Sequence, residues 1–290
     1  MKQFRNMLYP YVVWLFIMVL VPMLMILLYA FTTAGNEVTT FRFTLDNFSR
    51  FLTDTVFLDV LKRSLLIAVV TTVVCVLLGY PIAYTIAKGP ERSGFFWIML
   101  ITLPTWINML VRTYAWVGIL QDDGLVNRFL GMLGIGSFHM LYTTFAVVLG
   151  MVYNFIPFMI LQIHSSLAKM DKSLLEAASD LGATPMQSFL KVTLPLSLPG
   201  VLSGITLVFL PAVSSFFIPK LLAISSFVIP KLLGGGQYVL VGNVIETQFL
   251  TSGDWNFGSA ISLIMAVIIM LSMWLTRKVD TDPAANGKGA

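Results

Sequence analysis

The residues best placed to do chemistry in this 290-residue chain lie in one polar stretch between two apolar runs. The stretch runs from Lys169 to Pro195 and centres on Glu176, with Asp180 four residues further on. Four residues is about one helical turn, so both carboxylates would share one face of a helix, at a cost of about 0.2–0.5 kcal/mol. A basic partner surface opposite them would relieve that cost, so the pair favours a docking role.

The same stretch carries signals for helix boundaries. Ser173 and Glu176 have the spacing of a capping box, which begins a helix, and Gly182 is placed to end that helix. Thr184 and Pro185 suit the N-cap and the first residue of a second short helix. The spacing therefore predicts two short helices, joined by a glycine turn and lying outside the membrane.

Residues for catalysis or metal binding do not gather anywhere in the sequence. There is no GxxxxGK[ST] phosphate loop, so ATP is not expected to bind this chain by that route. His139 and His164 stand alone, without metal-ligand spacing, and Cys75 is a single cysteine in an apolar run. We expect no catalytic residue, metal or cofactor on this chain, and any ATP and magnesium to be bound by a separate subunit.

The composition is that of a membrane protein. Hydrophobic residues make up 57% of the chain, charged residues only 11%, and the mean hydropathy is +0.87. A soluble domain has about 25% charged residues. The net charge of +4 is small, and no basic run is interleaved with aromatic residues, which argues against nucleic-acid binding. The solvent for most of this chain is expected to be lipid.

Apolar runs of about 20 residues can cross a bilayer as helices, and the chain has six. The third is expected to be broken near Pro104 and Arg112, and the fifth to begin near Leu198, with Pro195 and Pro199 marking its start and Pro211 inside it. The six runs are roughly 9–31, 64–87, 94–120, 144–164, 198–222 and 258–276. The fold class is an all-α polytopic membrane protein with a polar N-terminal tail, 1–8, a transmembrane domain, 9–276, and a polar C-terminal tail, 277–290.

Lysine and arginine in the connections set the expected orientation. If the N-terminus is cytoplasmic, ten of the 18 basic residues lie on the inner side and eight lie outside or within the membrane. An even number of spans then places both termini, and the loop 169–195, in the cytoplasm.

An eleven-residue segment is repeated in tandem. Residues 212–222 read AVSSFFIPKLL, residues 223–233 read AISSFVIPKLL, and nine of the eleven positions match. Two interpretations stay open, a tolerated duplication at the outer end of the fifth span and a lengthened element that lines an outer vestibule.

The polar stretch resembles the EAA motif of ABC-importer permeases. Glu176-Ala177-Ala178, Gly182 and Leu194-Pro195 carry the resemblance, and Val192 replaces the usual isoleucine. In that family this loop forms the coupling helices that dock into a groove of the ATPase subunit. The resemblance implies this role for Ser173, Glu176, Ala177, Ala178, Asp180, Leu181, Gly182, Pro185, Leu194 and Pro195.

Within that family the chain is similar to the permeases for spermidine and putrescine. The resemblance rests on Pro104-x-Trp106-x-Asn108, Arg112-x-Tyr114-x-Trp116, Gly124-x-x-Asn127, Gly242-Asn243-Val244-Ile245 and Asp254-Trp255-x-Phe257-Gly258. Polyamines are polycations, which are bound by carboxylates, carbonyls and aromatic faces. The candidate pathway residues are Trp106, Asn108, Tyr114, Trp116, Asn243, Glu246, Asp254 and Trp255, with ordinary structural or solvated roles as the alternative. Arg112 would repel a polycation and is expected to extend to the membrane interface.

The resemblance implies a type I ABC-importer permease (MetI-like) fold in a bacterial cytoplasmic membrane. It also implies four kinds of partner: an ATPase dimer, a second permease subunit that is a homologue or a copy, an extracytoplasmic solute-binding protein, and the polyamine itself. Two alternatives are a permease for another small solute and an ion-driven secondary transporter. The latter is expected to have paired intramembrane carboxylates and interrupted spans in two matching halves, and we find neither pattern in the sequence. A further alternative is a membrane scaffold protein, which would not need a helix-turn-helix loop with this spacing.

Overall fold

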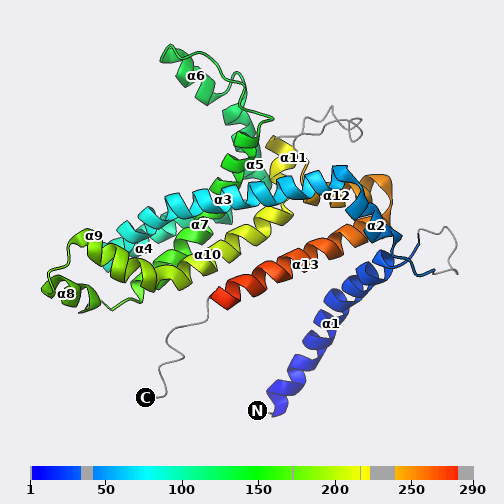
Figure 1. The fold of residues 1–290 in the computed structure, drawn as a ribbon, viewed down its shortest axis with the longest axis horizontal. Coiled ribbons are helices and arrows are strands. Elements are labelled where there is room, and N and C mark those ends of the chain that lie inside the picture. The colour runs from blue at the N-terminus through cyan, green and yellow to red at the C-terminus, as the bar shows by residue number, and fades with distance from the viewer. Residues whose placement is uncertain (1, 34–41, 172, 216, 223–238, 280–290) are drawn as a thin grey trace. The chain divides into compact units, whose positions relative to one another are not determined.

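The fold was analysed in a computed structural model, which describes residues 2–33, 42–171, 173–215, 217–222 and 239–279. These described residues fall into two units, one within 1–62 and 241–270 and the other within 63–240 and 271–290. Helices dominate both units (Figure 1). Their bounds are α1 Lys2–Ala30, α2 Asp46–Thr53, α3 Thr55–Lys88, α4 Glu91–Thr102, η1 Leu103–Trp106, α5 Met109–Leu120, α6 Leu125–Met132, α7 Thr144–Ala168, α8 Ser173–Asp180, α9 Pro185–Ser188, η2 Phe189–Thr193, α10 Leu194–Ser214, α11 Phe217–Leu222, α12 Val241–Thr247, η4 Gln248–Ser252 and α13 Trp255–Val279.

The predicted membrane spans are confirmed, with corrected boundaries. Among the described residues, five helices are long and apolar enough to cross a membrane, and a sixth span results if one bent helix pair is counted. The first lies at Tyr9–Ala30, close to the prediction. The second begins earlier than predicted, at Thr55, because the polar first turns of α3 around Asp59 continue the helix beyond the apolar run.

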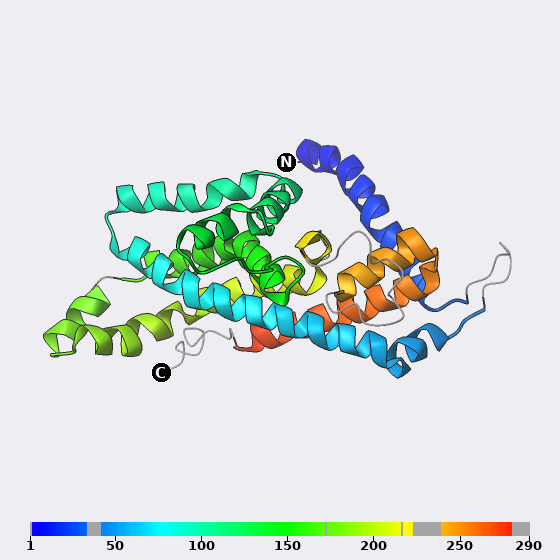
Figure 2. The same cartoon turned by 90° about the horizontal axis from the view of Figure 1, so that it is seen from above.

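The third span is the bent pair. Its two helices meet at an angle of 91° (Figure 2). The break lies at Ile107–Asn108, after a 3-10 turn that contains Pro104, and Asn108 Oδ1 accepts a hydrogen bond from Leu110 N–H at 2.8 Å to begin α5. The predicted break near Pro104 is therefore confirmed. The predicted break near Arg112 is wrong, since Arg112 lies inside α5.

The fifth span is longer at its beginning than predicted. One helical segment runs without interruption from Pro185 to Ser214, so the predicted start near Leu198 is wrong. A proline inside an α-helix removes a hydrogen bond and clashes with the preceding turn. Here the π-helical turn Phe189–Thr193 ends two residues before Pro195, and Leu194 N–H donates to Phe189 O. The wider turn accommodates the proline, and the helix continues.

The other end of this span is shorter than predicted. α10 ends at Ser214, and α11 is a separate short helix. The first copy of the tandem repeat is thus divided between the two helices, and residues 223–233, the second copy, lie outside the described residues.

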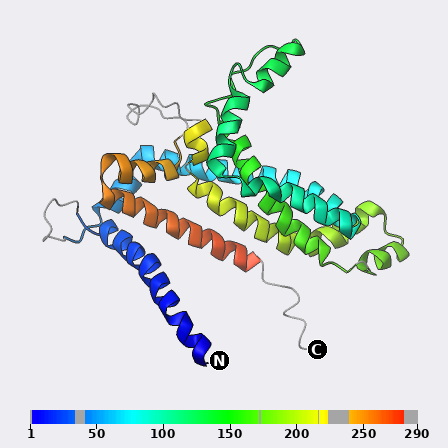
Figure 3. The same ribbon diagram turned by 180° about the vertical axis from the view of Figure 1, so that it is seen from behind.

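Two long helices, α7 and α10, form the centre of the second unit and lie side by side (Figures 1 and 3). Their close approach depends on Gly200 and Gly204. A Cβ added at Gly200 would lie 2.4 Å from Ser166 Cβ and 2.8 Å from Gln162 O, and one at Gly204 would lie 2.6 Å from Met159 Sδ. The buried side chains around this crossing include Met159, Ile163 and Val208.

Gly200→Ala is therefore expected to lower stability, by about 1–3 kcal/mol for an overpacked helix contact. The backbone oxygen of Gln162 cannot rotate out of the way as a side chain could. Gly118→Ala is the matched control, because a Cβ on this α5 glycine would meet nothing within 4 Å and alanine favours the helix. Thermal unfolding of the detergent-solubilised protein measures both. Equal melting temperatures for the two variants would contradict the close packing at Gly200.

The first unit has an aromatic core. Phe51 and Phe257 are buried, and the Phe57 ring lies 5.0 Å from the Phe257 ring and 6.0 Å from the Phe51 ring. The buried Asn256 amide donates to Tyr29 O at 3.0 Å and to Thr32 O at 2.9 Å, which ties the beginning of α13 to the end of α1. By contrast, most α1 side chains from Tyr9 to Leu28 are exposed, as expected for a helix whose solvent is lipid.

Candidate functional site

The two short helices predicted around Glu176 are present as α8 and α9 (Figure 1). α8 ends in the pattern of a Schellman motif. Gly182 has a φ of +79°, its N–H donates to Ser179 O at 2.9 Å, and Ala183 N–H donates to Ala178 O at 3.0 Å. The glycine turn is therefore confirmed, and Gly182 holds a backbone conformation that other residues rarely adopt.

The beginning of α9 is also as predicted. Thr184 is its N-cap and Pro185 its first residue. Thr184 Oγ1 accepts from Gln187 N–H at 3.3 Å, and Gln187 Oε1 accepts from Thr184 N–H at 3.0 Å. This reciprocal pair is a capping box. It fixes the direction in which α9 leaves the turn.

The predicted capping box at the beginning of α8 is wrong. Ser173 is the first residue of the helix, and its N–H donates to Asp171 Oδ1 at 2.9 Å. Asp171 thus supplies the acceptor that was expected from Glu176. The hydrogen bonds from Ser173, first from its backbone and then from its hydroxyl, lower the pKa of the Asp171 carboxyl below its ordinary value. The Glu176 side chain therefore takes no part in capping α8.

α8 presents an exposed surface. None of its residues is buried, and the carboxylates of Glu176 and Asp180 lie on exposed residues. Leu174 is 44% exposed, and Leu181, which follows the helix, is 89% exposed. Ala177 is exposed and Ala178 partly so. A short rigid helix that offers leucines, alanines and two carboxylates together can dock onto an apolar and basic groove.

The remaining loop residues have a different position from the one predicted. Leu194 and Pro195 lie in the first turn of α10, continuous with α9 through the π-helical turn, and so belong to the membrane-spanning helix. Thus the structure brings Ser173, Glu176, Ala177, Ala178, Asp180, Leu181 and Gly182 together, with Pro185 following directly. The physical reason for the difference is the π-helical turn described above.

The candidate pathway residues of the second unit do not form one cluster of contacts. Trp106 is 89% exposed and Tyr114 is 60% exposed. Asn108 caps α5, whereas the Trp116 ring packs against the Tyr153 ring of α7 at 5.3 Å. Two of the four, Trp106 and Tyr114, therefore offer open aromatic faces, and the other two have structural contacts.

In the first unit, Asp254 has two structural partners. Its Oδ2 lies 3.1 Å from Arg50 Nη1, and its Oδ1 accepts from Phe257 N–H at 3.0 Å at the beginning of α13. The Trp255 ring packs against Phe249 at 5.5 Å and Tyr29 at 6.3 Å. Asn243 is buried and Glu246 is partly exposed, both in α12.

These contacts predict how Asp254 variants behave. Asp254→Ala is expected to lose roughly 1 kcal/mol of stability with the helix cap. Asp254→Asn keeps the acceptor for Phe257 N–H and loses only the exposed ion pair, worth about 0.2–1 kcal/mol, so its melting temperature should lie closer to that of the unmodified chain. Solute uptake by the asparagine variant is the deciding measurement. Uptake that disappears while stability remains would assign Asp254 to the solute instead.

Arg112 lies inside α5 and is partly exposed. Its Nε and Nη1 atoms are buried and have no hydrogen-bond partner among the described residues. The Oδ1 atom of buried Asn154 in α7 is likewise without a partner in the described part of the chain. Arginine and asparagine are costly within apolar membrane segments, so the sequence alone marks these two positions as unusual.

A further pair was missed on the connection between the third and fourth spans. His139 Nδ1 lies 2.9 Å from Asp122 Oδ1, and Asn127 is buried, with its amide donating to Phe138 O at 2.9 Å and to Gln121 O at 3.1 Å. These contacts close the loop on itself. They explain Asn127, which the sequence marked only by its spacing from Gly124.

Comparison with known proteins gives close relatives. No model of a protein family matches the chain. The chain is similar to the spermidine/putrescine transport system permease protein PotB of Escherichia coli (strain K12), at 38% identity over 93% of this chain and 98% of that protein. It is equally similar to the protein of the same name from Salmonella typhimurium (strain SL1344), at 38% identity over 94% of this chain and 92% of that protein.

Solved structures agree on the fold. A chain in the crystal structure of a bacterial alginate ABC transporter, in complex with an alginate pentasaccharide-bound periplasmic protein, matches with a TM-score of 0.78. The match covers 97% of this chain and 96% of that one, at 16% sequence identity. It supports the overall fold, and at that identity it carries no argument about the solute.

Proposed function

This chain belongs to the family of ABC-importer permeases that includes the PotB proteins, and on that premise we propose that it imports a polyamine, spermidine or putrescine. It is a multi-pass membrane protein and the non-catalytic permease subunit of its transporter. The proposal for the solute rests on the identity of 38% with permeases of that name across almost the whole chain.

The observation that supports a coupling role is the exposed surface of α8. Glu176 lies on a helix with no buried residue, between a capped beginning and a glycine turn. We propose that this helix docks onto the ATPase subunit, which binds ATP and magnesium, and that the loop residues from Ser173 to Pro185 carry the motion of that subunit to α10. The chain contributes no catalytic group.

The assembly proposed around the chain has three further components. They are a dimer of ATPase subunits, a second permease that is a homologue or a copy, and an extracytoplasmic binding protein that delivers the solute. Both termini and the loop 169–195 are assigned to the cytoplasm, with the polar tails 1–8 and 277–290 flanking the transmembrane domain 9–276. The balance of basic residues in the connections supports this orientation.

Among the candidate residues for the solute pathway, we propose that the two exposed aromatic side chains contribute most. Trp106 and Tyr114 are exposed near the break of the third span and can accept a cation over their rings. Glu246 adds a carboxylate from α12. Asp254 and Asn108 are weaker members, because helix capping already uses them. Trp116 and Trp255 are held in aromatic pairs, and Asn243 is buried.

Uptake of labelled spermidine into cells or vesicles that contain the whole transporter tests the proposed solute. Uptake should depend on this chain, and a tenfold excess of unlabelled putrescine should reduce it by about tenfold if the two solutes share one site of similar affinity. An equal excess of a neutral sugar or an amino acid is the control. Competition by the control solutes, without competition by putrescine, would favour a permease for another small solute.

A further inference from the structure

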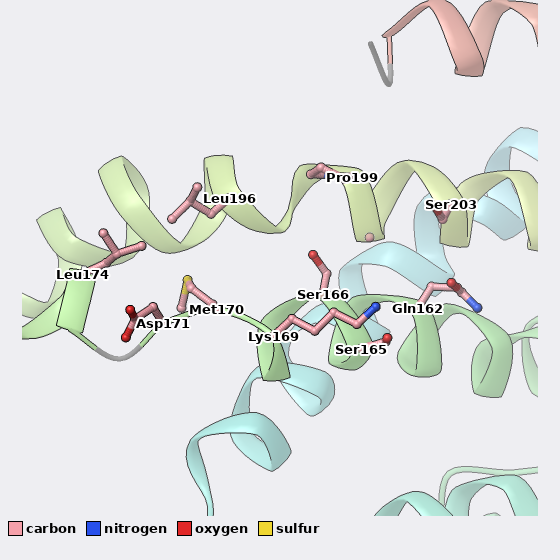
Figure 4. Close-up of a pocket in the computed structure, with 11 residues that line it drawn as sticks. Gln162, Ser165, Ser166, Lys169, Met170, Asp171, Leu174, Leu196, Pro199 and Ser203 are labelled. Atoms are coloured by element: carbon pink, nitrogen blue, oxygen red, sulfur yellow. The ribbon is translucent and has the colours of Figure 1, made fainter. Parts of the chain in front are cut away.

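A pocket lies between the end of α7 and the beginning of α10, facing the start of α8 (Figure 4). Its volume is about 500 Å³. All residues that line it belong to the second unit, and none belongs to the proposed solute pathway. The close crossing of α7 and α10 at Gly200 fixes its inner wall, since Gly200 itself lines the pocket.

Five polar side chains of this pocket are not used by the fold. Gln162, Ser165, Ser166 and Lys169 from α7, with Ser203 from α10, line it. None of these five side chains makes a hydrogen bond or ion pair within the described part of the chain, although several helical serines and threonines elsewhere bond to the preceding turn, as Thr206 does to Leu202 O at 3.0 Å. The pocket therefore offers three hydroxyls, an amide and an ammonium to a ligand.

Two opposite charges stand apart in the same pocket. The Lys169 side chain extends along α7 toward Gln162, while the Asp171 carboxylate points the other way (Figure 4). The two groups form no ion pair with each other among the described residues. Hydrogen bonds from Ser173 lower the pKa of Asp171, so its carboxyl is ionised at neutral pH. A ligand that complements this pocket carries an anionic group and a cationic group.

The position of the pocket along the span indicates which compartment supplies that ligand. α7 has 25 residues, which is about 37 Å of helix, whereas the hydrocarbon core is about 30 Å thick. Its last turns, where the pocket lies, therefore reach the headgroup layer. Exposed apolar side chains of α10, Leu196 and Pro199, border the pocket and offer a surface for the upper part of an acyl chain.

We propose that this pocket binds the phosphoethanolamine headgroup of a membrane phospholipid. The phosphate lies against Lys169 and the serine hydroxyls, and the primary ammonium lies against Asp171. The bound lipid connects the end of α7 to the beginning of α8 and so steadies the loop that carries Glu176. A polyamine fits this pocket less well, because Lys169 would repel it and the hydroxyl-lined half would meet no anion.

Native mass spectrometry of the purified, delipidated transporter tests the proposal by titration with single lipids. Phosphatidylethanolamine should bind on the order of tenfold more tightly than phosphatidylcholine, whose quaternary ammonium cannot donate a hydrogen bond to Asp171. Lys169→Met should weaken phosphatidylethanolamine binding by a similar factor. Asp171→Asn, which can still accept from Ser173 N–H, should abolish the preference and leave anionic phosphatidylglycerol the better ligand.

Lys191→Met is the matched control, since Lys191 is an exposed lysine on the adjoining helical segment that does not line the pocket. Equal losses for Lys169→Met and Lys191→Met, or an unchanged lipid preference in Asp171→Asn, would overturn the proposal. Soluble phosphoethanolamine is titrated in parallel. If it binds as tightly as the lipid, the assignment to a membrane lipid is wrong. Binding is measured without transport, so either result is independent of the proposed function.

Discussion

Glu176→Lys is expected to abolish stable assembly of the permease with its ATPase and to reduce uptake to background. The Glu176 side chain is exposed and makes no hydrogen bond or ion pair among the described residues, so the change should not disturb α8 itself. Loss of one charged partner in a buried interface costs roughly 2–5 kcal/mol. Even the lower figure is about a 30-fold weaker association. Co-purification of the ATPase with the tagged permease measures it.

Asp123→Lys is the control for the change in net charge. Asp123 is also an exposed carboxylate, but it lies on the connection after α5. This variant should retain the ATPase and transport at the level of the unmodified chain. If Glu176→Lys also retains both, α8 is not the docking element, whereas the assignment to the permease family would stand on its sequence relatives alone.

Gly182→Val is the second large effect we expect, with uptake falling below about one tenth of its normal value. A φ of +79° is strained for any residue with a Cβ and most strained for a β-branched one, at about 1–3 kcal/mol. The backbone relieves that strain by leaving the left-handed region, which breaks the two bonds of the turn and changes the direction of α8 relative to α9. A Glu176 carboxylate pointing elsewhere can no longer meet its partner.

Two comparisons separate coupling from simple strain. Gly182→Asn should transport at an intermediate level, because asparagine tolerates the left-handed conformation. Gly134→Val places the same side chain at a φ of +74° in the connection between the third and fourth spans, and it should leave ATPase binding intact. Equal loss of ATPase binding in Gly134→Val and Gly182→Val would mean that general destabilisation explains both.

Hydropathy and turn chemistry predicted much of this fold from the sequence. The spans are recognisable because a helix in lipid must be apolar along its whole length, as Tyr9–Ala30 is. Gly182 and Thr184 were readable for a local reason. Their roles depend only on the residues within one turn of them, so spacing along the chain was sufficient.

Features that depend on distant residues could not be predicted in this way. Asp254 looked available to a cation, but its ion-pair partner Arg50 is 204 positions away in the sequence. Pro195 looked like the end of a loop, and only the hydrogen bond across the π-helical turn explains why the helix continues through it. The burial of the Arg112 Nε and Nη1 atoms similarly depends on tertiary packing, which local spacing does not encode.

The unbroken helix from Pro185 to Ser214 has a mechanical consequence. At 30 residues it is about 45 Å long and continuous from the short helix α9 to the far end of α10. We therefore expect a tilt imposed at Pro185 to swing Ser214 in the opposite direction, about the point along the helix that is held most firmly. The close contact with α7 at Gly200 and Gly204, near the middle of this helix, is the expected pivot point. We thus expect a small displacement of one end of the helix to produce a comparable displacement of the other end.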